Sequence, residues 1–131
     1  MRNRPQPEIG TEAALLGDGA ALRDILALAG PDIAPRLMAQ IVTDLSATST
    51  QLAPAIACRD WAQIRVQSHV LISLAGTIGA MGLHADACCL NDAAHAQDEA
   101  LLATLAPSVT ADLAALVAVV TARRNAQGAT P

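Results

Sequence analysis

Apolar residues recur every three or four positions along most of the chain, which is the spacing of one face of an α-helix. The pattern predicts five helices, over about residues 18–29, 32–57, 60–78, 83–105 and 109–124. The connections between the second, third and fourth are short, so neighbouring helices are expected to run antiparallel. The prediction is therefore an up-and-down antiparallel four-helix bundle with an additional C-terminal helix.

The chain is expected to form one domain, divided by these helices. The bundle core occupies residues 18–105, and the C-terminal helix occupies residues 107–124, opened by Pro107 and Ser108. Residues 1–17 read as an N-terminal arm with a helical turn around Glu12–Leu16, and residues 125–131 as a tail that frays.

Polar and proline residues mark where the second and third helices begin and where the second is distorted. Asp32 and Asp60 are N-cap residues by type and position, because a carboxylate there accepts a free backbone amide. Pro54 lies inside the second helix and lacks the amide hydrogen that would bond to Thr50. We therefore expect the helix to bend or break within a turn of residues 50–54.

Composition supports an all-α fold and narrows the range of functions and partners to be considered. Of the 131 residues, 53% are hydrophobic, yet Trp61 is the only aromatic residue, so strands rich in aromatic side chains are not expected. The net charge of −4 and the absence of lysine argue against nucleic acid as a partner. The longest strongly apolar stretch, near Leu113–Val120, is too short to span a bilayer.

Cysteine usage and the start of the chain favour the cytoplasm. The first eight residues are not followed by the apolar stretch of a signal peptide. Three cysteines, of which Cys88 and Cys89 are adjacent, do not form a disulfide framework and are expected to be small, partly buried residues. A cytoplasmic location with no membrane contact is the expectation.

The segment 60–80 carries the strongest candidate for chemistry, His69. On a helical wheel, one face of this segment is apolar and is expected to pack in the core: Ile64, Leu71, Leu74, Ala75 and Ile78. His69 falls on the opposite face, where its neighbours Ser73 and Gly76 are small. An imidazole on an outer face with small neighbours is accessible to a large reactant.

Other catalytic and metal-binding patterns are weak in this sequence. His84 and Cys88 are one helical turn apart, but two further metal ligands are not evident. His95 lies eleven residues beyond His84, about 16 Å along a helix, too far to share one ion. No metal site is predicted. No Ser-His-Asp order, glycine-rich phosphate loop or paired carboxylate motif stands out, so a self-sufficient enzyme is not expected.

The residues from Asp60 to His95 resemble the histidine-containing phosphotransfer (HPt) domain family. The family pattern has Asp-Trp after a long helix, then a small residue, the active histidine and a glycine- and alanine-rich stretch, then a further helix. The matching residues are Asp60, Trp61, Ser68, His69, Leu71, Ala75, Gly76, Ile78, Gly79, Ala80, Leu83 and Leu90. The resemblance covers roughly residues 18–105, and a fifth helix is a common addition in the family.

The sequence departs from the family pattern at three positions. Ile72 stands where the family has lysine, Ser73 where it has glycine, and Asn91 where it has glutamate. Arg65, one turn before His69, is expected to supply the missing positive charge.

Two of the polar residues near His69 are expected to act on it directly. Asn91 and His95 are four residues apart, so they face the same way and, by the resemblance, flank the active ring. Asn91 is expected to bond one ring nitrogen of His69 and so fix its tautomer. The Ser73 hydroxyl is expected to bond back to the His69 carbonyl.

The resemblance implies a histidine phosphocarrier in a two-component phosphorelay. His69 would accept phosphate from an aspartate of a receiver domain and pass it to another receiver, while the receiver supplies Mg²⁺ and the carrier needs no cofactor. Partners would be response-regulator receiver domains or a hybrid histidine kinase. Val66, Ile72 and Met81 are the expected docking residues.

Two alternatives stay open at this point. A degenerate HPt-like bundle would bind a receiver or kinase without carrying phosphate, and the missing lysine supports it. A helical homodimer on the alanine-rich faces is the other alternative to the expected monomer.

Overall fold

The computed structural model describes residues 9–128, and helices account for nearly all of them. They are α1 (Ile9–Leu16), α2 (Ala20–Ala29), α3 (Ala34–Ala57), α4 (Trp61–Ile78), α5 (Met81–Ala96) and α6 (Glu99–Gly128). Residues 9–128 contain no strand, so the all-α prediction is confirmed. The predicted helical turn at Glu12–Leu16 is part of α1, whereas residues 1–8 of the predicted arm lie outside the described residues.

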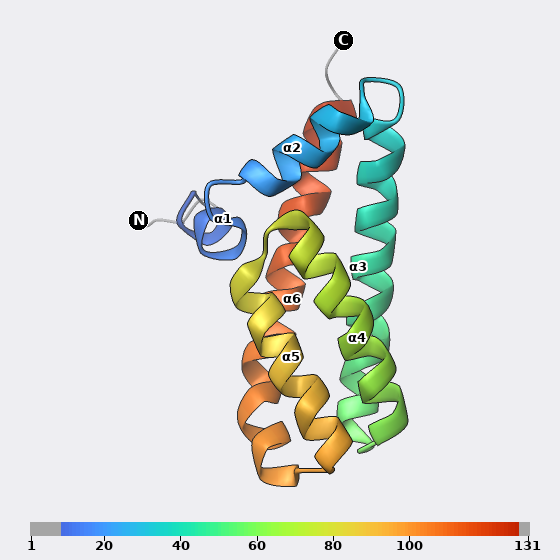
Figure 1. The fold of residues 1–131 in the computed structure, drawn as a ribbon, viewed down its shortest axis with the longest axis vertical. Coiled ribbons are helices and arrows are strands. Elements are labelled where there is room, and N and C mark those ends of the chain that lie inside the picture. Colours follow the sequence, from blue (N-terminus) through green and yellow to red (C-terminus); the bar gives the residue numbers. More distant parts are fainter. Residues whose placement is uncertain (1–8, 129–131) are drawn as a thin grey trace, which may run out of the picture.

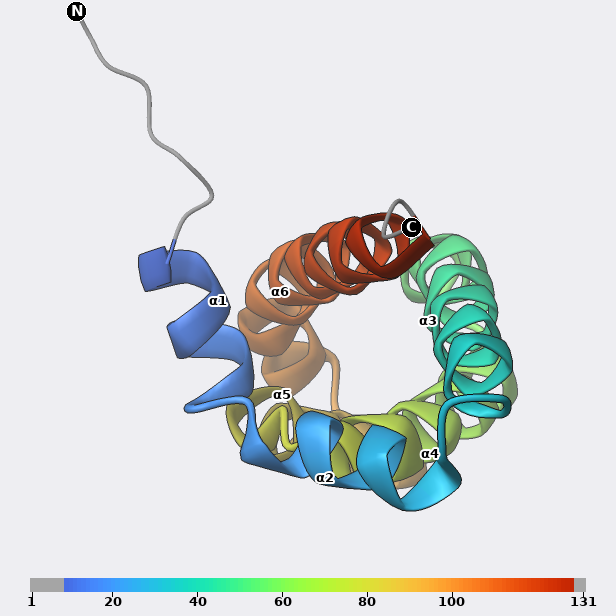
Figure 2. The same ribbon diagram turned by 90° about the horizontal axis from the view of Figure 1, so that it is seen from above.

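The four long helices, α3 to α6, pack side by side in a ring, and consecutive helices run in opposite directions (Figures 1 and 2). Each of them contacts the next, and α6 closes the ring by packing along α3. The short helices α1 and α2 lie at one end of the ring, where α2 contacts α3 and α4. The C-terminal helix, which the sequence analysis treats as an addition, is therefore one of the four long helices, and the predicted first helix is not.

The boundary between the fourth and fifth predicted helices is wrong. The predicted helix over 83–105 ends at Ala96, because Gln97 adopts a left-handed conformation with φ of 52°. The Asp98 carboxylate then accepts the Leu101 amide at 3.0 Å and starts α6. Pro107 lies inside α6 and does not open it, and the helix continues past the predicted end at residue 124 to Gly128.

This longer α6 also corrects the prediction about apolar stretches. Over Glu99–Ala126 it is long and apolar enough, by length and composition, to cross a membrane, although core helices pass the same test. One side of α6 contributes to the core of the ring. The buried residues on that side are Leu102, Val109, Leu113, Leu116 and Val120.

The two predicted N-caps have different outcomes. Asp60 caps α4, and its carboxylate accepts the Gln63 amide at 3.1 Å. Asp32 does not cap α3, whose N-cap position is Ile33 and carries no side-chain hydrogen bond. The Gly30 carbonyl accepts the amides of residues 33 and 34 at 3.2 and 2.8 Å, so the backbone itself satisfies the start of this helix.

Pro54 does not break α3. The helix runs without interruption to Ala57, and the Pro54 carbonyl accepts the Cys58 amide at 3.0 Å. Because Pro54 lies in the last turn, its ring removes a single hydrogen bond close to the helix end. The bend at residues 50–54 stays a prediction.

Ion pairs join distant segments at both ends of the ring. Arg59, in the α3–α4 turn, donates from Nε to Glu99 at the start of α6 at 2.8 Å, and from a terminal nitrogen to the Ile56 carbonyl at 2.6 Å. At the other end, Arg123 of α6 pairs with Glu12 of α1. The second pair holds the N-terminal helix against the C-terminal one.

The different roles of Asp60 and Asp32 can be tested by comparing the free energy of unfolding of their alanine variants. Asp60→Ala removes a cap hydrogen bond and should lower the free energy of unfolding by about 1 kcal/mol. Asp32→Ala removes an exposed carboxylate without a cap hydrogen bond and should change it by less than about 0.5 kcal/mol. Urea unfolding followed by circular dichroism measures both, and equal losses would show that Asp32 also caps its helix.

Candidate functional site

Helix α4 exposes His69 on the side away from the core. As predicted, Ile64, Leu71, Ala75 and Ile78 are fully buried, whereas Leu74 is only partly buried. The His69 side chain is exposed, and within residues 9–128 it makes no hydrogen bond or ion pair. Both nitrogens of its ring are therefore open to a partner from solvent.

His69 lies in a shallow hollow of about 360 Å³ between α4 and α5. The hollow is lined by Arg65, Val66, His69 and Val70 from α4, and by Asn91 and His95 from α5. Four residues predicted to support or surround His69 are therefore brought together with it. Spacing places Arg65 and Val66 beside His69, because residues three or four apart share a helix face, whereas the positions of Asn91 and His95 were expected from the family resemblance.

Val70 belongs to the hollow but was not among the predicted site residues. It follows His69 directly, and 37% of its surface is exposed, while Val66 is 53% exposed. A β-branched apolar residue beside a candidate histidine, off the core stripe of its helix, is the signal that could have identified it. Together Val66 and Val70 give the hollow an apolar border.

Arg65 is the only arginine, and there is no lysine, among the residues that line the hollow. No aspartate or glutamate is among the lining residues. The Arg65 side chain is partly exposed and makes no ion pair or side-chain hydrogen bond in the part of the chain that the structure describes. An unpaired guanidinium beside an exposed imidazole is a favourable environment for an anion.

Asn91 does not bond to His69, which corrects the prediction about its tautomer. The Asn91 side-chain oxygen lies 3.2 Å from the hydroxyl of Ser68, which donates toward it. Ser68 is fully buried, and the Arg65 carbonyl is a second acceptor at 3.2 Å. Asn91 therefore connects α5 to the residue before His69.

Gly76 serves a different purpose from the predicted one. A Cβ atom added there would lie 3.2 Å from Nδ1 of His84, so the glycine makes room for the His84 ring of α5. The same Nδ1 donates to the Ile72 carbonyl at 3.0 Å, which fixes the His84 ring against α4. The space beside Gly76 is therefore partly filled by the His84 ring.

Three other predicted residues lie outside the hollow. Ser73 forms no hydrogen bond with the His69 carbonyl; Thr77 is the residue that bonds back along the helix, to the Ser73 carbonyl at 2.9 Å. Ile72 is partly buried and packs against the core, and Met81, 56% exposed, lies at the start of α5. Ser73, Ile72 and Met81 are not among the residues that line the hollow.

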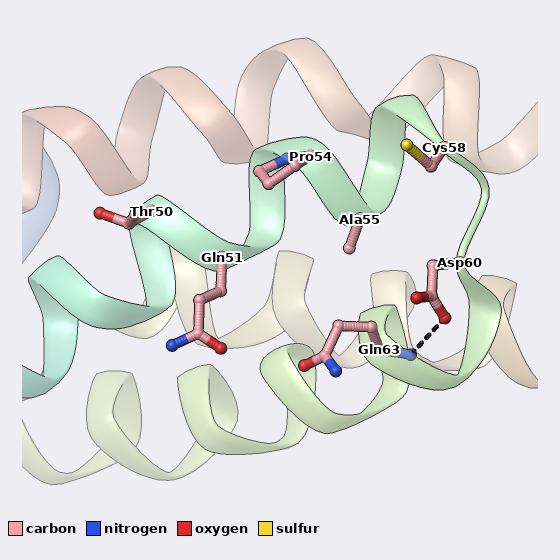
Figure 3. Close-up of a pocket in the computed structure, with 7 residues that line it drawn as sticks. All are labelled: Thr50, Gln51, Pro54, Ala55, Cys58, Asp60 and Gln63. Carbon is pink, nitrogen blue, oxygen red and sulfur yellow. Dashed lines mark hydrogen bonds between the residues drawn. The ribbon is translucent and has the colours of Figure 1, made fainter.

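A second hollow, of about 390 Å³, lies between α3 and α4 near the turn that joins them (Figure 3). Its lining residues are Thr50, Gln51, Pro54, Ala55, Cys58, Asp60 and Gln63. Asp60 is engaged in capping α4, as the dashed line in Figure 3 shows, and the free thiol of Cys58 is exposed. No histidine or arginine lines this hollow, so the chemistry of the His69 hollow has no counterpart here.

Comparison with known proteins finds no match: no protein-family model, no curated protein and no solved structure is recognisably similar to the chain. Among the described residues, no three histidine, cysteine or acidic side chains are grouped so that they could hold a metal ion.

The contact between Gly76 and His84 can be tested by a double-mutant cycle. Gly76→Ala improves helix propensity by about 1 kcal/mol but presses on the His84 ring. We expect it to stabilise the protein more in a His84→Ala background than in the wild type, by about 0.5 kcal/mol or more. Urea unfolding of the four proteins measures the difference, and strictly additive effects would contradict the contact.

Proposed function

We propose that the protein is a histidine phosphocarrier of a two-component phosphorelay, with His69 as the phosphoryl acceptor. One observation carries the proposal: an exposed imidazole without hydrogen bonds shares a carboxylate-free hollow with the unpaired guanidinium of Arg65. A phosphoryl group on His69 would find a cation beside it and no like charge among the lining residues.

The reaction needs little from the carrier. A nitrogen lone pair of His69 forms the N–P bond to an aspartyl phosphate, and the P–O bond breaks so that the aspartate carboxylate leaves with the electron pair. The receiver domain that carries the aspartate supplies Mg²⁺, which neutralises much of the developing charge. Transfer to a second receiver is the same step in reverse, and the carrier contributes the position of one ring.

The helical architecture suits this task. We interpret the ring of α3 to α6 as the up-and-down antiparallel four-helix bundle expected of an HPt domain, with α1 and α2 covering one end. A ring mounted on the middle of a long packed helix is held more accurately than one on a loop. The proposal includes receiver domains or a hybrid kinase as partners, a cytoplasmic location, a monomeric carrier and no cofactor of its own.

Arg65 takes the place of the lysine that the HPt family has three residues after the histidine. The position of that lysine holds Ile72, which is partly buried against the core. Arg65 is one turn before His69 and lines the same hollow. A guanidinium can donate two parallel hydrogen bonds to a phosphoryl group, so it is a suitable replacement.

The second candidate function is a binder of receivers or kinases that carries no phosphate. The apolar, partly buried Ile72 in place of the lysine favours it. The two candidates share the docking surface but differ in one property, the formation of phosphohistidine. Phosphorylation assays therefore separate them.

Substitution of His69 tests the carrier directly. The protein is incubated with a panel of phosphorylated receiver domains and Mg²⁺, and separately with phosphoramidate, and intact mass is measured at neutral and acid pH. We expect one acid-labile phosphoryl group on the wild type and none on His69→Gln, whose stability should change by less than about 0.5 kcal/mol. Failure of the wild type to accept phosphate, with binding to a receiver retained, would favour the binder; phosphate on His84 or His95 would refute the site.

Substitution of Arg65 tests the replacement of the lysine. Arg65→Ala should slow transfer from a receiver about tenfold, since a charge-assisted hydrogen bond contributes roughly 1.5 kcal/mol. The matched control is Arg36→Ala, which removes an exposed arginine at the start of α3. Rapid-mixing measurements of transfer compare the two, and equal rates would leave Arg65 without a role.

A further inference from the structure

The helix that carries His69 is apolar on more than its buried face. Ile64 and Leu71 are fully buried, but Val66 and Val70 are exposed, and Ile72 is partly buried on a third side. Apolar side chains beside the buried stripe let a small rotation of α4 exchange one apolar contact for another at little cost. Hydrophobic packing alone therefore does not determine which way His69 points.

Two polar residues immediately before His69 lie between helices. The Gln67 amide nitrogen donates to Gln51 of α3 and to Gln63 of α4, each at 2.9 Å, and Gln67 is 8% exposed. Figure 3 shows Gln51 extending from α3 toward α4. On the other side, the fully buried Ser68 bonds to Asn91 of α5. Helix α4 is thus joined by polar bonds to both of its neighbours at adjacent residues.

We propose that the Gln51–Gln67 hydrogen bond, together with the Ser68–Asn91 bond, sets the rotation of α4 and so positions the His69 ring in its hollow. A rotation of α4 that separates Gln67 from Gln51 and Ser68 from Asn91 removes both bonds to the neighbouring helices, and each group then keeps only its partner within α4, Gln63 or the Arg65 carbonyl. Because Gln67 and Ser68 are nearly or fully buried, water does not readily replace the lost partners. A rotation of α4 by about 20° would move a ring at the helix surface by roughly 2 Å. Gln51 and Gln67 are positioning residues, since neither lines the hollow.

The orientation of the ring does not depend on any activity of the protein, whereas its effect on transfer rests on the proposed function. The test variant is Gln51→Leu combined with Gln67→Leu, which removes the partly buried bond and keeps side chains of similar volume at an exposed position of α3 and a nearly buried position of α4. One partner is exposed and a typical neutral hydrogen bond contributes only about 1 kcal/mol, so loss of folding is not the expected outcome. Gln51→Glu is the conservative rescue variant, because its carboxylate still accepts from Gln67.

The matched control is Thr48→Val. Thr48 is a buried polar residue of α3, 2% exposed, whose hydroxyl forms no bond to another helix within residues 9–128. The Thr48→Val substitution removes a buried hydroxyl from the same helix as Gln51 and leaves the hydrogen bonds of α4 unchanged. Any general effect of making the core less polar should be seen equally in this variant.

The first measurement is the NMR spectrum of the histidine rings. In the wild type, Gln51→Glu and Thr48→Val, the His69 ring should give one sharp set of signals. In the double leucine variant these signals should shift, broaden or double, while those of His95 on α5 keep their line width. An unchanged His69 spectrum in the double variant would overturn the proposal, whatever the protein does with phosphate.

The second measurement is transfer from the receiver domain that reacts fastest in the panel above. It should slow roughly tenfold or more in the double variant, because small misplacements of a reacting group are costly, and should stay near the wild-type rate in Gln51→Glu. Labelling by phosphoramidate, a small donor that needs no docking, should be unchanged. A wild type that takes no phosphate would refute the proposed function and leave the NMR result to decide the orientation.

Discussion

The close packing of α4 against α5 is the interaction on which the candidate site depends. The two helices are joined through Gly79, with φ of 82°, and Ala80, and several of their buried residues are small. Ala75 on α4 and Ala87 and Ala94 on α5 are completely buried. Short side chains let the two backbones approach closely, which places residues of both helices around one hollow.

The close approach of α4 and α5 also determines which part of the α4 surface is filled by a side chain of α5. Where α4 has glycine, at residue 76, the imidazole of His84 fills the space and bonds to the α4 backbone. The two imidazoles therefore have opposite roles: His84 is fixed between helices, whereas His69 is free in solvent. The pattern around His69 singles it out in the sequence, but the position of His84 between the helices depends on what α4 contributes at Ile72 and Gly76.

The helices that could be predicted are those whose ends have strong local signals. Asp60 and Gly79 delimit α4 as the sequence indicates, since a carboxylate cap and a left-handed glycine are both local features. The end of α5 is different, because Gln97 is not a residue that usually ends a helix. Pro107 is the more conspicuous signal and predicts a helix start, but α6 continues through it. The packing of α6 on α3 and α5 offsets the hydrogen bond that the proline removes.

The candidate site, like the helices, could be predicted from the sequence only in part. Arg65, Val66, Asn91 and His95 could be grouped with His69 by helical spacing and family resemblance, and the hollow contains all of them. The roles of Gly76 and Asn91 could not be foreseen, because each is decided by a partner on another helix. Gln67 gave no signal of its own, since a glutamine on a helix is ordinarily a surface residue.

The ion pair between Arg59 and Glu99 has a local consequence. It fastens the α3–α4 turn to the first turn of α6, two segments forty residues apart in the chain. Both side chains are well exposed, so the pair itself adds little to overall stability. Its effect is local: it ties the α3–α4 turn to the start of α6, so loss of either side chain would release both segments from each other with little change in overall stability.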